Sequence, residues 1–392
     1  MINVGTGKDS SLDVQKAAIE ATKRALSETG NKANLIIVFS SINFAKKELL
    51  EGIKSVAQEA KIVGCTTGGE IIDENVGEGN VAIMAIETDT IDVVVDYEEK
   101  IKGREKEAGV KLAKKIKDVS KKELKSLMIL VDGFVNGQEL IEGIQGVLGK
   151  YFPIVGALAG DNFQFKKTYQ YFNDKVLTDS AIAVGFCGDF SFGAAMGHGW
   201  KPVSIPKGIN KAEGFSIEKI EKGTGISLYK EYLGEEADQL TKEPLSTISL
   251  NYPLGFEVEG SKEVIIRTTV SATKEGSLTC AGPIIKEGKV RLMVSEIDEG
   301  IEAARNISKD ALSQIKNKKP KLAIAFNCIC RYKLFGPTKQ KEILAIKEVI
   351  GKDVPLIGFY SHGEIGPLDS KNKDFSFSVL QNSSLCIYLL AE

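Results

Sequence analysis

The stretch FNCICR, residues 326–331, combines residue types that could bind a small charged molecule. Asn327, Cys328 and Arg331 follow the apolar run LAIAF, so we expect them at the carboxyl end of a buried strand. Ligands of open α/β sheets tend to bind at that end of the strands. The guanidinium of Arg331 is a planar, permanently charged donor that suits a carboxylate.

A second stretch, GFYSHGE, should lie beside the first because both follow strands of one repeated unit. Its Glu364 could accept an ammonium group, so Arg331 and Glu364 together predict a site for an amino acid or a similar small carboxylate. The alternative is a direct Arg331–Glu364 ion pair without a ligand. The candidate site also includes neighbours from the second stretch: Tyr360, His362 and Gly363.

The same kind of loop occurs three times, as GCTTGGE (64–70), GALAGD (156–161) and GFYSHGE (358–364). Each begins with a glycine after an apolar strand, where close backbone approach or a positive φ requires glycine. Each ends with an acid, which could accept loop amides or meet a ligand. A structural role is favoured for Glu70 and Asp161, with Asn162 beside them in the candidate site, and both roles stay open for Glu364.

These loops belong to a longer repeat of helix, strand, helix, strand, loop and strand. The first strands of the copies are LIIVF (35–39), LMILV (127–131) and LAIAF (322–326). Amphipathic helices precede them, with apolar residues three and four apart, at 11–29, 104–118 and 298–315. Strands joined by helical crossovers are usually parallel, so the order predicts an α/β fold with mixed, layered sheets.

Residues 199–297 fit this unit poorly, and we interpret them as a degenerate fourth copy. The chain then consists of two pseudo-symmetric halves, residues 1–198 and 199–392. The boundary lies near GHGWKPVS (197–204), where Gly, Trp and Pro interrupt the strand pattern.

Cys328 has three interpretations: a small buried hydrophobe, a reactive thiol or a metal ligand. A nucleophilic Cys328 with His362 as its base is conceivable, but no third group is evident to orient the histidine. Structural zinc needs four ligands with characteristic spacing, and the chain has only His198 and His362 besides its cysteines. We therefore expect neither a metal site nor an enzyme, and Cys328-dependent catalysis is an alternative.

The glycine-rich opening GTGKDSS (5–11) is only superficially similar to a phosphate-binding loop. Such a loop places a serine or threonine directly after the lysine, whereas Asp9 follows Lys8 here. Ser10 or Ser11 as the N-cap of the following helix is the better explanation.

The composition is that of an ordinary globular protein, with 43% apolar and 27% charged residues among 392. A net charge of −2 and no basic stripe disfavour nucleic-acid binding. The start lacks a signal-peptide pattern, and no apolar run is long enough to span a membrane. Six cysteines without framework spacing indicate reduced thiols, so we expect a cytoplasmic protein.

Taken together, these motifs resemble the FIST sensory domain family, in its N-terminal plus C-terminal arrangement. The landmarks VGCTTGGEI, GALAGDN, LYKEYLG, YPLGF, FNCICR and IGFYSHGEIGP follow the family's order over nearly the whole chain. The resemblance implies a bacterial signal-input module that binds a small ligand, with amino acids the usual suggestion.

Family members are typically fused to, or encoded near, chemoreceptors, histidine kinases or cyclic-dinucleotide enzymes. This sequence ends at YLLAE without an output domain, so we expect a separate signalling partner of that kind. Some members are reported as haem-dependent nitric-oxide sensors, and the haem alternative would use His198 or His362 as the proximal ligand. Otherwise we expect no cofactor.

Overall fold

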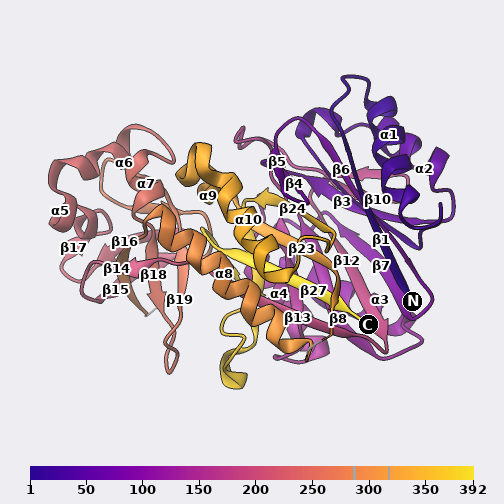
Figure 1. Cartoon of the computed structure of the whole chain (residues 1–392). Coiled ribbons are helices and arrows are strands. Elements are labelled where there is room, and N and C mark those ends of the chain that lie inside the picture. Colours follow the sequence, from indigo (N-terminus) through magenta and orange to yellow (C-terminus); the bar gives the residue numbers. More distant parts are fainter. Residues whose placement is uncertain (286–287, 317) are drawn as a thin grey trace.

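The structure is a computed structural model that describes residues 1–285, 288–316 and 318–392. It consists of a body of three repeated units, each centred on a six-stranded sheet, and an inserted domain built on a nine-stranded sheet. The inserted domain (residues 201–294) extends to the left of the body in Figure 1, and both chain ends lie together on the far side of the body.

Each unit contains the strands and helices that the sequence predicts, together with an additional first strand and a short hairpin. The first unit comprises β1 (Ile2–Asp9), α1 (Val14–Ser27), β2 (Leu35–Ser40), η1 (Ile42–Phe44), α2 (Lys47–Val56), β3 (Lys61–Thr66), β4 (Glu70–Ile72), β5 (Asn75–Gly77) and β6 (Val81–Thr88). The second comprises β7 (Ile91–Glu99), α3 (Glu105–Val119), β8 (Leu124–Val131), α4 (Gly137–Leu148), β9 (Ile154–Leu158), β10 (Gln170–Phe172), β11 (Lys175–Leu177) and β12 (Ser180–Gly188).

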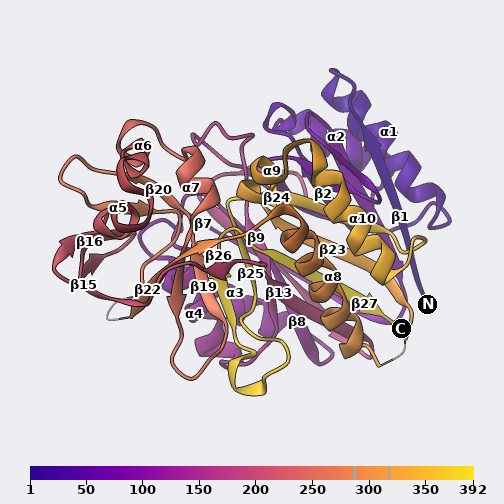
Figure 2. The same ribbon diagram turned by 60° about the vertical axis from the view of Figure 1, so that its left-hand side comes forward.

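The third unit begins with β13 (Ser191–Gly197) and resumes after the inserted domain. It continues with α8 (Ile297–Gln314), β23 (Pro320–Cys328), α9 (Ile329–Phe335), η3 (Gly336–Thr338), α10 (Lys339–Ile350), β24 (Leu356–Ser361), β25 (Gly363–Pro367), η4 (Lys373–Phe375), β26 (Ser378–Gln381) and β27 (Leu385–Ala391). Figure 2 shows α8 and α10 next to each other on the outside of this unit.

The three units exchange their hairpins in a ring. Hairpin β10–β11 pairs with β3 of the first unit, β25–β26 with β9 of the second, and β4–β5 with β24 of the third. The strand orders are therefore equivalent: β1-β6-β2-β3-β10-β11, β7-β12-β8-β9-β25-β26 and β13-β27-β23-β24-β4-β5. Each sheet is completed by a neighbour, which gives the body a pseudo-threefold arrangement.

The inner faces of the three sheets share one apolar core, in which Phe39 of the first unit contacts Phe359 of the third. A pair of helices covers the outer face of each sheet: α1 with α2, α3 with α4, and α8 with α10. The predicted class, mixed α/β from repeated helix and strand units, is confirmed.

The inserted domain lies between β13 and α8 and does not repeat the unit. It contains β14 (Lys201–Pro202), β15 (Lys207–Glu213), β16 (Ser216–Ile220), β17 (Gly223–Thr224), α5 (Ser227–Leu233), η2 (Gly234–Asp238), α6 (Gln239–Lys242), α7 (Thr247–Asn251), β18 (Leu254–Glu257), β19 (Val264–Arg267), β20 (Thr269–Ala272), β21 (Leu278–Cys280) and β22 (Lys289–Val294). Its strand pairs are all antiparallel, without the parallel pair that a crossover helix gives each unit of the body. The segment therefore differs from the degenerate fourth unit that we expected.

The opening GTGKDSS lies mostly in β1 and packs under α1. A Cβ atom on Gly7 would stand 2.0 Å from the carbonyl oxygen of Ala21, so glycine lets the helix approach the strand. The N-cap of α1 is Asp13, whose side chain accepts from the amide of Lys16. The prediction of Ser10 or Ser11 as N-cap is therefore wrong, because the strand continues to Asp9 and the helix begins later.

Candidate functional site

The three glycine loops meet at the centre of the body and are joined by a ring of backbone hydrogen bonds. The amide of Gly68 donates to the carbonyl of Tyr360 at 2.7 Å. The equivalent amides donate in the same way, His362 to Leu158 at 3.2 Å and Gly160 to Thr66 at 2.9 Å. The three loops are thus equivalent corners of the body, by which we mean the glycine loops 64–70, 156–161 and 358–364, and each is held by a backbone hydrogen bond to another.

The starting glycines of these loops are needed for close approach. A Cβ atom at Gly64, Gly156 or Gly358 would stand about 2 Å from a carbonyl oxygen of the neighbouring parallel strand. This agrees with the structural role expected for the three glycines.

The acids of the first and third loops are held by their own loops. Thr67 donates to Glu70, and Ser361 donates to Glu364, each at 2.5 Å. A backbone amide then donates to the second oxygen of each carboxyl group, from Asn80 and Ser384 respectively, at 3.1 Å. Burial raises the pKa of Glu70 to about 7 and that of Glu364 well above its ordinary value. Both acids stabilise the corners from inside.

Asp161 plays a different part in the second loop. Its carboxylate accepts the amides of Phe165, Lys166 and Lys167 at 2.7–3.1 Å, which fixes a segment that contains several residues with positive φ. Burial alone would raise the pKa of Asp161, but the nearby His362 and the loop amides that donate to the carboxylate hold it at about 2. The adjacent Asn162 accepts from Ser41 at 2.8 Å and so ties this loop to the first unit.

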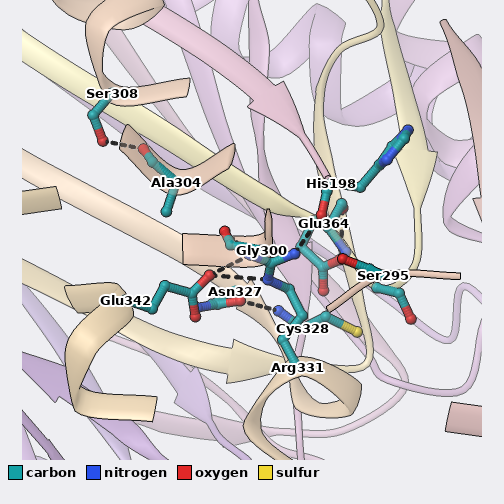
Figure 3. A network of polar contacts seen from close by, with 12 residues as sticks. His198, Ser295, Gly300, Ala304, Ser308, Asn327, Cys328, Arg331, Glu342 and Glu364 are labelled. Atoms are coloured by element: carbon teal, nitrogen blue, oxygen red, sulfur yellow. Dashed lines mark hydrogen bonds and ion pairs between the residues drawn. The ribbon is translucent and has the colours of Figure 1, made fainter. Parts of the chain in front are cut away.

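Arg331 is buried among internal partners, as Figure 3 shows. Its guanidinium pairs with Glu342 of α10 and donates to the carbonyls of His198 and Gly300 at 2.6 and 3.0 Å. Asn327 donates to the other oxygen of Glu342 at 2.8 Å. This network joins the end of β23, helix α9 and helix α10 to helix α8 and to His198, which follows β13.

The alternative of an Arg331–Glu364 ion pair is therefore wrong, because Glu342 takes the place of Glu364. The sequence could not show which acid pairs with Arg331, because Glu342 contacts Arg331 only where helices α9 and α10 pack together. A ligand carboxylate would have to displace Glu342 from a buried pair, so we leave Arg331 and Glu364 out of the site that we propose below.

An apolar cavity of about 570 Å³ lies where the second and third units meet the inserted domain; we call it the interface cavity. The second unit contributes Gly133, Phe134, Gln164 and Phe165. The inserted domain contributes Pro244, Leu245, Thr268, Val270 and Ala281. The third unit contributes Ile329, Cys330, His362 and Asn382. Phe134 and Phe165 are partly exposed, at 37% and 44%, so the cavity reaches the surface beside them.

Two buried polar atoms on the wall of the interface cavity have no hydrogen-bond partner in the described part of the chain: Nε2 of His362 and Oδ1 of Asn382. The imidazole of His362 stacks on Phe165 and meets the edge of Phe134, and its Nε2 lies 3.5 Å from Asp161. Asn382 donates to the His362 carbonyl and leaves its oxygen available. Buried polar groups are normally paired, so these atoms indicate a place for a ligand.

The two neighbouring cysteines have different surroundings. Cys328 ends β23, is 1% exposed and does not line the interface cavity. Cys330 is the second residue of α9 and does line it. Burial raises the pKa of Cys328, whereas the neighbouring Cys328 lowers the pKa of Cys330. The Sγ atom of Cys330 also lies 3.6 Å from the Thr268 hydroxyl.

Three further predicted site residues, Tyr360, Gly363 and His198, do not line the interface cavity. Tyr360 is fully buried against Tyr332, and the Gly363 amide donates to Ser361 at 3.3 Å. His198 lines a second hollow of about 530 Å³ at the edge of the inserted domain. Its Nδ1 accepts the Trp200 amide, and burial with the Arg331 charge lowers its pKa to about 4.

The haem alternative, with His198 or His362 as the proximal ligand, stays a prediction, and each histidine has a buried Nε2 without a hydrogen-bond partner among the described residues. His362 is held between Phe134 and Phe165, with one ring nitrogen facing Asp161 and the other directed at Gly133. His198 uses one nitrogen internally and is buried beside the Arg331 charge. Across residues 1–285, 288–316 and 318–392, no cluster of three or more His, Cys, Asp or Glu side chains could hold a metal ion.

The sequence predicted His362 and Asp161 as site residues, but it did not indicate Cys330, Thr268 or Asn382. Strand β23 ends at Cys328 and helix α9 begins at Ile329, so Cys330 lies on the helix. Thr268 and Asn382 lie far away in sequence and carry no motif. Among the described helices, none is long and apolar enough to cross a membrane.

Two protein-family models match this chain. The FIST N domain model matches residues 34–222 and the FIST C domain model matches residues 226–367. An uncharacterized protein of Methanocaldococcus jannaschii, MJ1623, is 26% identical over 300 residues, which cover 69% of this chain and 56% of that protein. An uncharacterized protein of Mycobacterium tuberculosis, Rv0628c, is 22% identical over 96% of this chain and 98% of its own length.

Among solved structures, a cyanuric acid hydrolase from A. caulinodans covers all of both chains with 7% identity and a TM-score of 0.38. PurL from T. maritima, complexed with ADP, is 8% identical, with a TM-score of 0.22 over all of this chain and 71% of that one. Neither likeness is close enough to support an argument. The two domain matches, which together span most of the chain, show that this protein belongs to the FIST family of sensory domains.

Proposed function

We propose that this protein is a sensory module that binds a small, mainly apolar ligand in the interface cavity. The observation that supports this most is the pair of unpartnered polar atoms, His362 Nε2 and Asn382 Oδ1, in an otherwise apolar wall. Binding pockets typically combine an apolar lining with a few polar groups that orient the ligand. FIST domains are sensory domains, so the proposal agrees with the family.

The polar atoms constrain the ligand. The Asn382 oxygen accepts, so the ligand must offer an N–H or O–H donor at that point. The apolar lining favours a hydrocarbon or aromatic body. An apolar amino acid supplies both features through its ammonium group and side chain. Its carboxylate meets no Lys or Arg among the lining residues, so we expect the amide or amine analogue to bind more tightly.

The position of the cavity suggests how binding is signalled. Its wall combines residues of both units and of the inserted domain, so a ligand that contacts all three favours their packed arrangement. The size of such a shift in free energy equals the difference between the ligand's binding free energies for the packed arrangement and for the less packed one. We propose that a separate cytoplasmic partner, such as a histidine kinase, a chemoreceptor or a cyclic-dinucleotide enzyme, reads this change.

A thermal-shift screen tests the ligand class. The panel contains leucine and phenylalanine, their amides, and the amines and carboxylates with the same side chains. A ligand at about 100 times its Kd stabilises the fold by about 2.7 kcal/mol, which raises the melting temperature measurably.

The substitution His362→Ala should weaken the best hit by about tenfold, since it removes one hydrogen bond in an apolar site. His198→Ala is the matched control, because His198 lines the other hollow, and it should bind as the wild type does. Equal loss in both variants, or a panel without any stabilising compound, would count against the proposal.

A further inference from the structure

The interface cavity contains a thiol as well as hydrogen-bonding groups. Cys330 is one of six free cysteines, and all six are buried. The other five, Cys65, Cys187, Cys280, Cys328 and Cys386, are not among the residues that line this cavity. We infer that Cys330 is a covalent attachment site for electrophilic ligands with an apolar body, such as α,β-unsaturated carbonyl compounds.

The surroundings of Cys330 favour nucleophilic attack. The Thr268 hydroxyl lies 3.6 Å from its sulfur. The neighbouring Cys328, and then Thr268 and Ser383, lower the pKa of Cys330. The pKa of every other cysteine is raised by burial. The thiolate is the reactive form, so the cysteine with a lowered pKa should react first.

The cavity provides the second requirement, which is selection of the electrophile. Its lining of Phe134, Phe165, Leu245, Val270 and Ile329 offers apolar contacts but no cationic side chain. His362 and Asn382 carry the unpartnered atoms that can orient a polar group of the ligand. A small uncharged electrophile should therefore reach Cys330, whereas a charged one should be disfavoured by desolvation.

The reaction balances without a further reagent. The sulfur of Cys330 forms a bond to the β-carbon of the acceptor, and the electron pair of the carbon–carbon double bond moves to the α-carbon. The α-carbon then takes a proton in place of the one lost by the thiol. The net change is the addition of S–H across the double bond, so the protein gains the full mass of the ligand.

The test is alkylation of the reduced protein, after removal of the reductant, with N-ethylmaleimide, which is small and uncharged, followed by intact mass and peptide mapping. We expect one adduct at Cys330, formed at least ~10-fold faster than at any other cysteine. The variant Cys330→Ser should lose the fast adduct, and the matched variant Cys187→Ser, which changes a cysteine outside the interface cavity, should keep the fast adduct at residue 330. Negatively charged iodoacetate should react at Cys330 more slowly than uncharged iodoacetamide.

This inference rests on the same cavity as the proposed function, but the two can fail separately. Fast labelling at another cysteine, or equal labelling of all six, would overturn the covalent site while leaving reversible ligand binding intact. Conversely, fast Cys330 labelling in a protein that no panel compound stabilises would support the covalent site and reject the reversible sensor.

Discussion

At the scale of single residues, the acids of the three corners illustrate how burial separates a structural carboxyl group from a ligand-binding one. Glu70 and Glu364 each satisfy their oxygens with a hydroxyl and an amide of the protein itself. The repeated acid was visible in the sequence, but its partners were not. Among the described loop residues, Tyr360 and His362 each have a buried side-chain atom without a partner, and of these two His362 lines the interface cavity.

Glu70 predicts a specific dependence of stability on pH. Burial raises its pKa from 4.5 to about 7, so the folded state holds the proton more tightly than the unfolded state does. Its favourable contribution is complete below pH 4.5 and is lost as the pH rises towards 7. Since one pKa unit corresponds to about 1.4 kcal/mol, the contribution of Glu70 to the free energy of unfolding should fall by about 3 kcal/mol over this pH range.

The variant Glu70→Gln should remove this dependence, so its unfolding free energy should change less between pH 4.5 and 7 than that of the wild type. Urea unfolding at several pH values measures the effect. Glu78→Gln changes an exposed acid in the same unit and serves as the control. A wild type with a flat profile over this range would show that the buried carboxyl group does not titrate as described.

At the scale of elements, strand β1 contains glycines that a motif search would assign to a phosphate-binding loop. In the structure, Gly7 is needed because a helix packs against it. Gly7 allows α1 to lie directly on the strand, because a Cβ atom at this position would stand only 2.0 Å from the carbonyl oxygen of Ala21 in α1. Gly7→Ala should therefore destabilise the fold by about 1–3 kcal/mol. Gly208→Ala is the matched control, since nothing lies within 4 Å of its Cβ position. Similar costs for both variants in denaturant unfolding would refute the close-packing explanation.

Helix α9 depends on the buried pair of Arg331 and Glu342. Arg331→Met leaves Glu342 buried without its charge partner, so we expect a loss of about 3–5 kcal/mol in unfolding free energy. The double variant Arg331→Met with Glu342→Leu should lose less than the single one. Arg291→Met breaks the half-exposed pair with Glu257 and should cost at most about 1 kcal/mol. Additive losses in the double variant would argue against a coupled pair.

The sequence predicted the elements better than their connections. The helices and the long strands follow from apolar spacing, and their observed bounds agree within a few residues. The hairpins β4–β5, β10–β11 and β25–β26 have strands of three to five residues, too short to show a period. Their exchange between units depends on contacts far apart in sequence, such as Glu70 with Phe359. The same limit hid Thr268 and Asn382 from the candidate site.

At the scale of the whole molecule, hairpin exchange makes the units depend on one another. The inserted domain is tied to the third unit as well, because the Ile266 amide donates to the side chain of Gln381 at 3.1 Å and the Asn382 amide donates to the Ile266 carbonyl at 3.1 Å. Trp200, just before the inserted domain, packs against Ile266 and Met293 of that domain. We therefore expect a single cooperative transition. The fluorescence of Trp200 and the far-UV circular dichroism should report the same midpoint in urea. Separate midpoints would mean that the inserted domain unfolds on its own.

The central claim is that a small ligand occupies the interface cavity. Its most direct test is calorimetric titration of the best screening hit into two variants that carry the same substitution. Val270→Phe fills the cavity, whereas Val203→Phe places the same ring on the surface, where Val203 is 44% exposed. Our account predicts that Val270→Phe abolishes binding and that Val203→Phe retains the wild-type Kd. Unchanged binding to a folded Val270→Phe variant would contradict it.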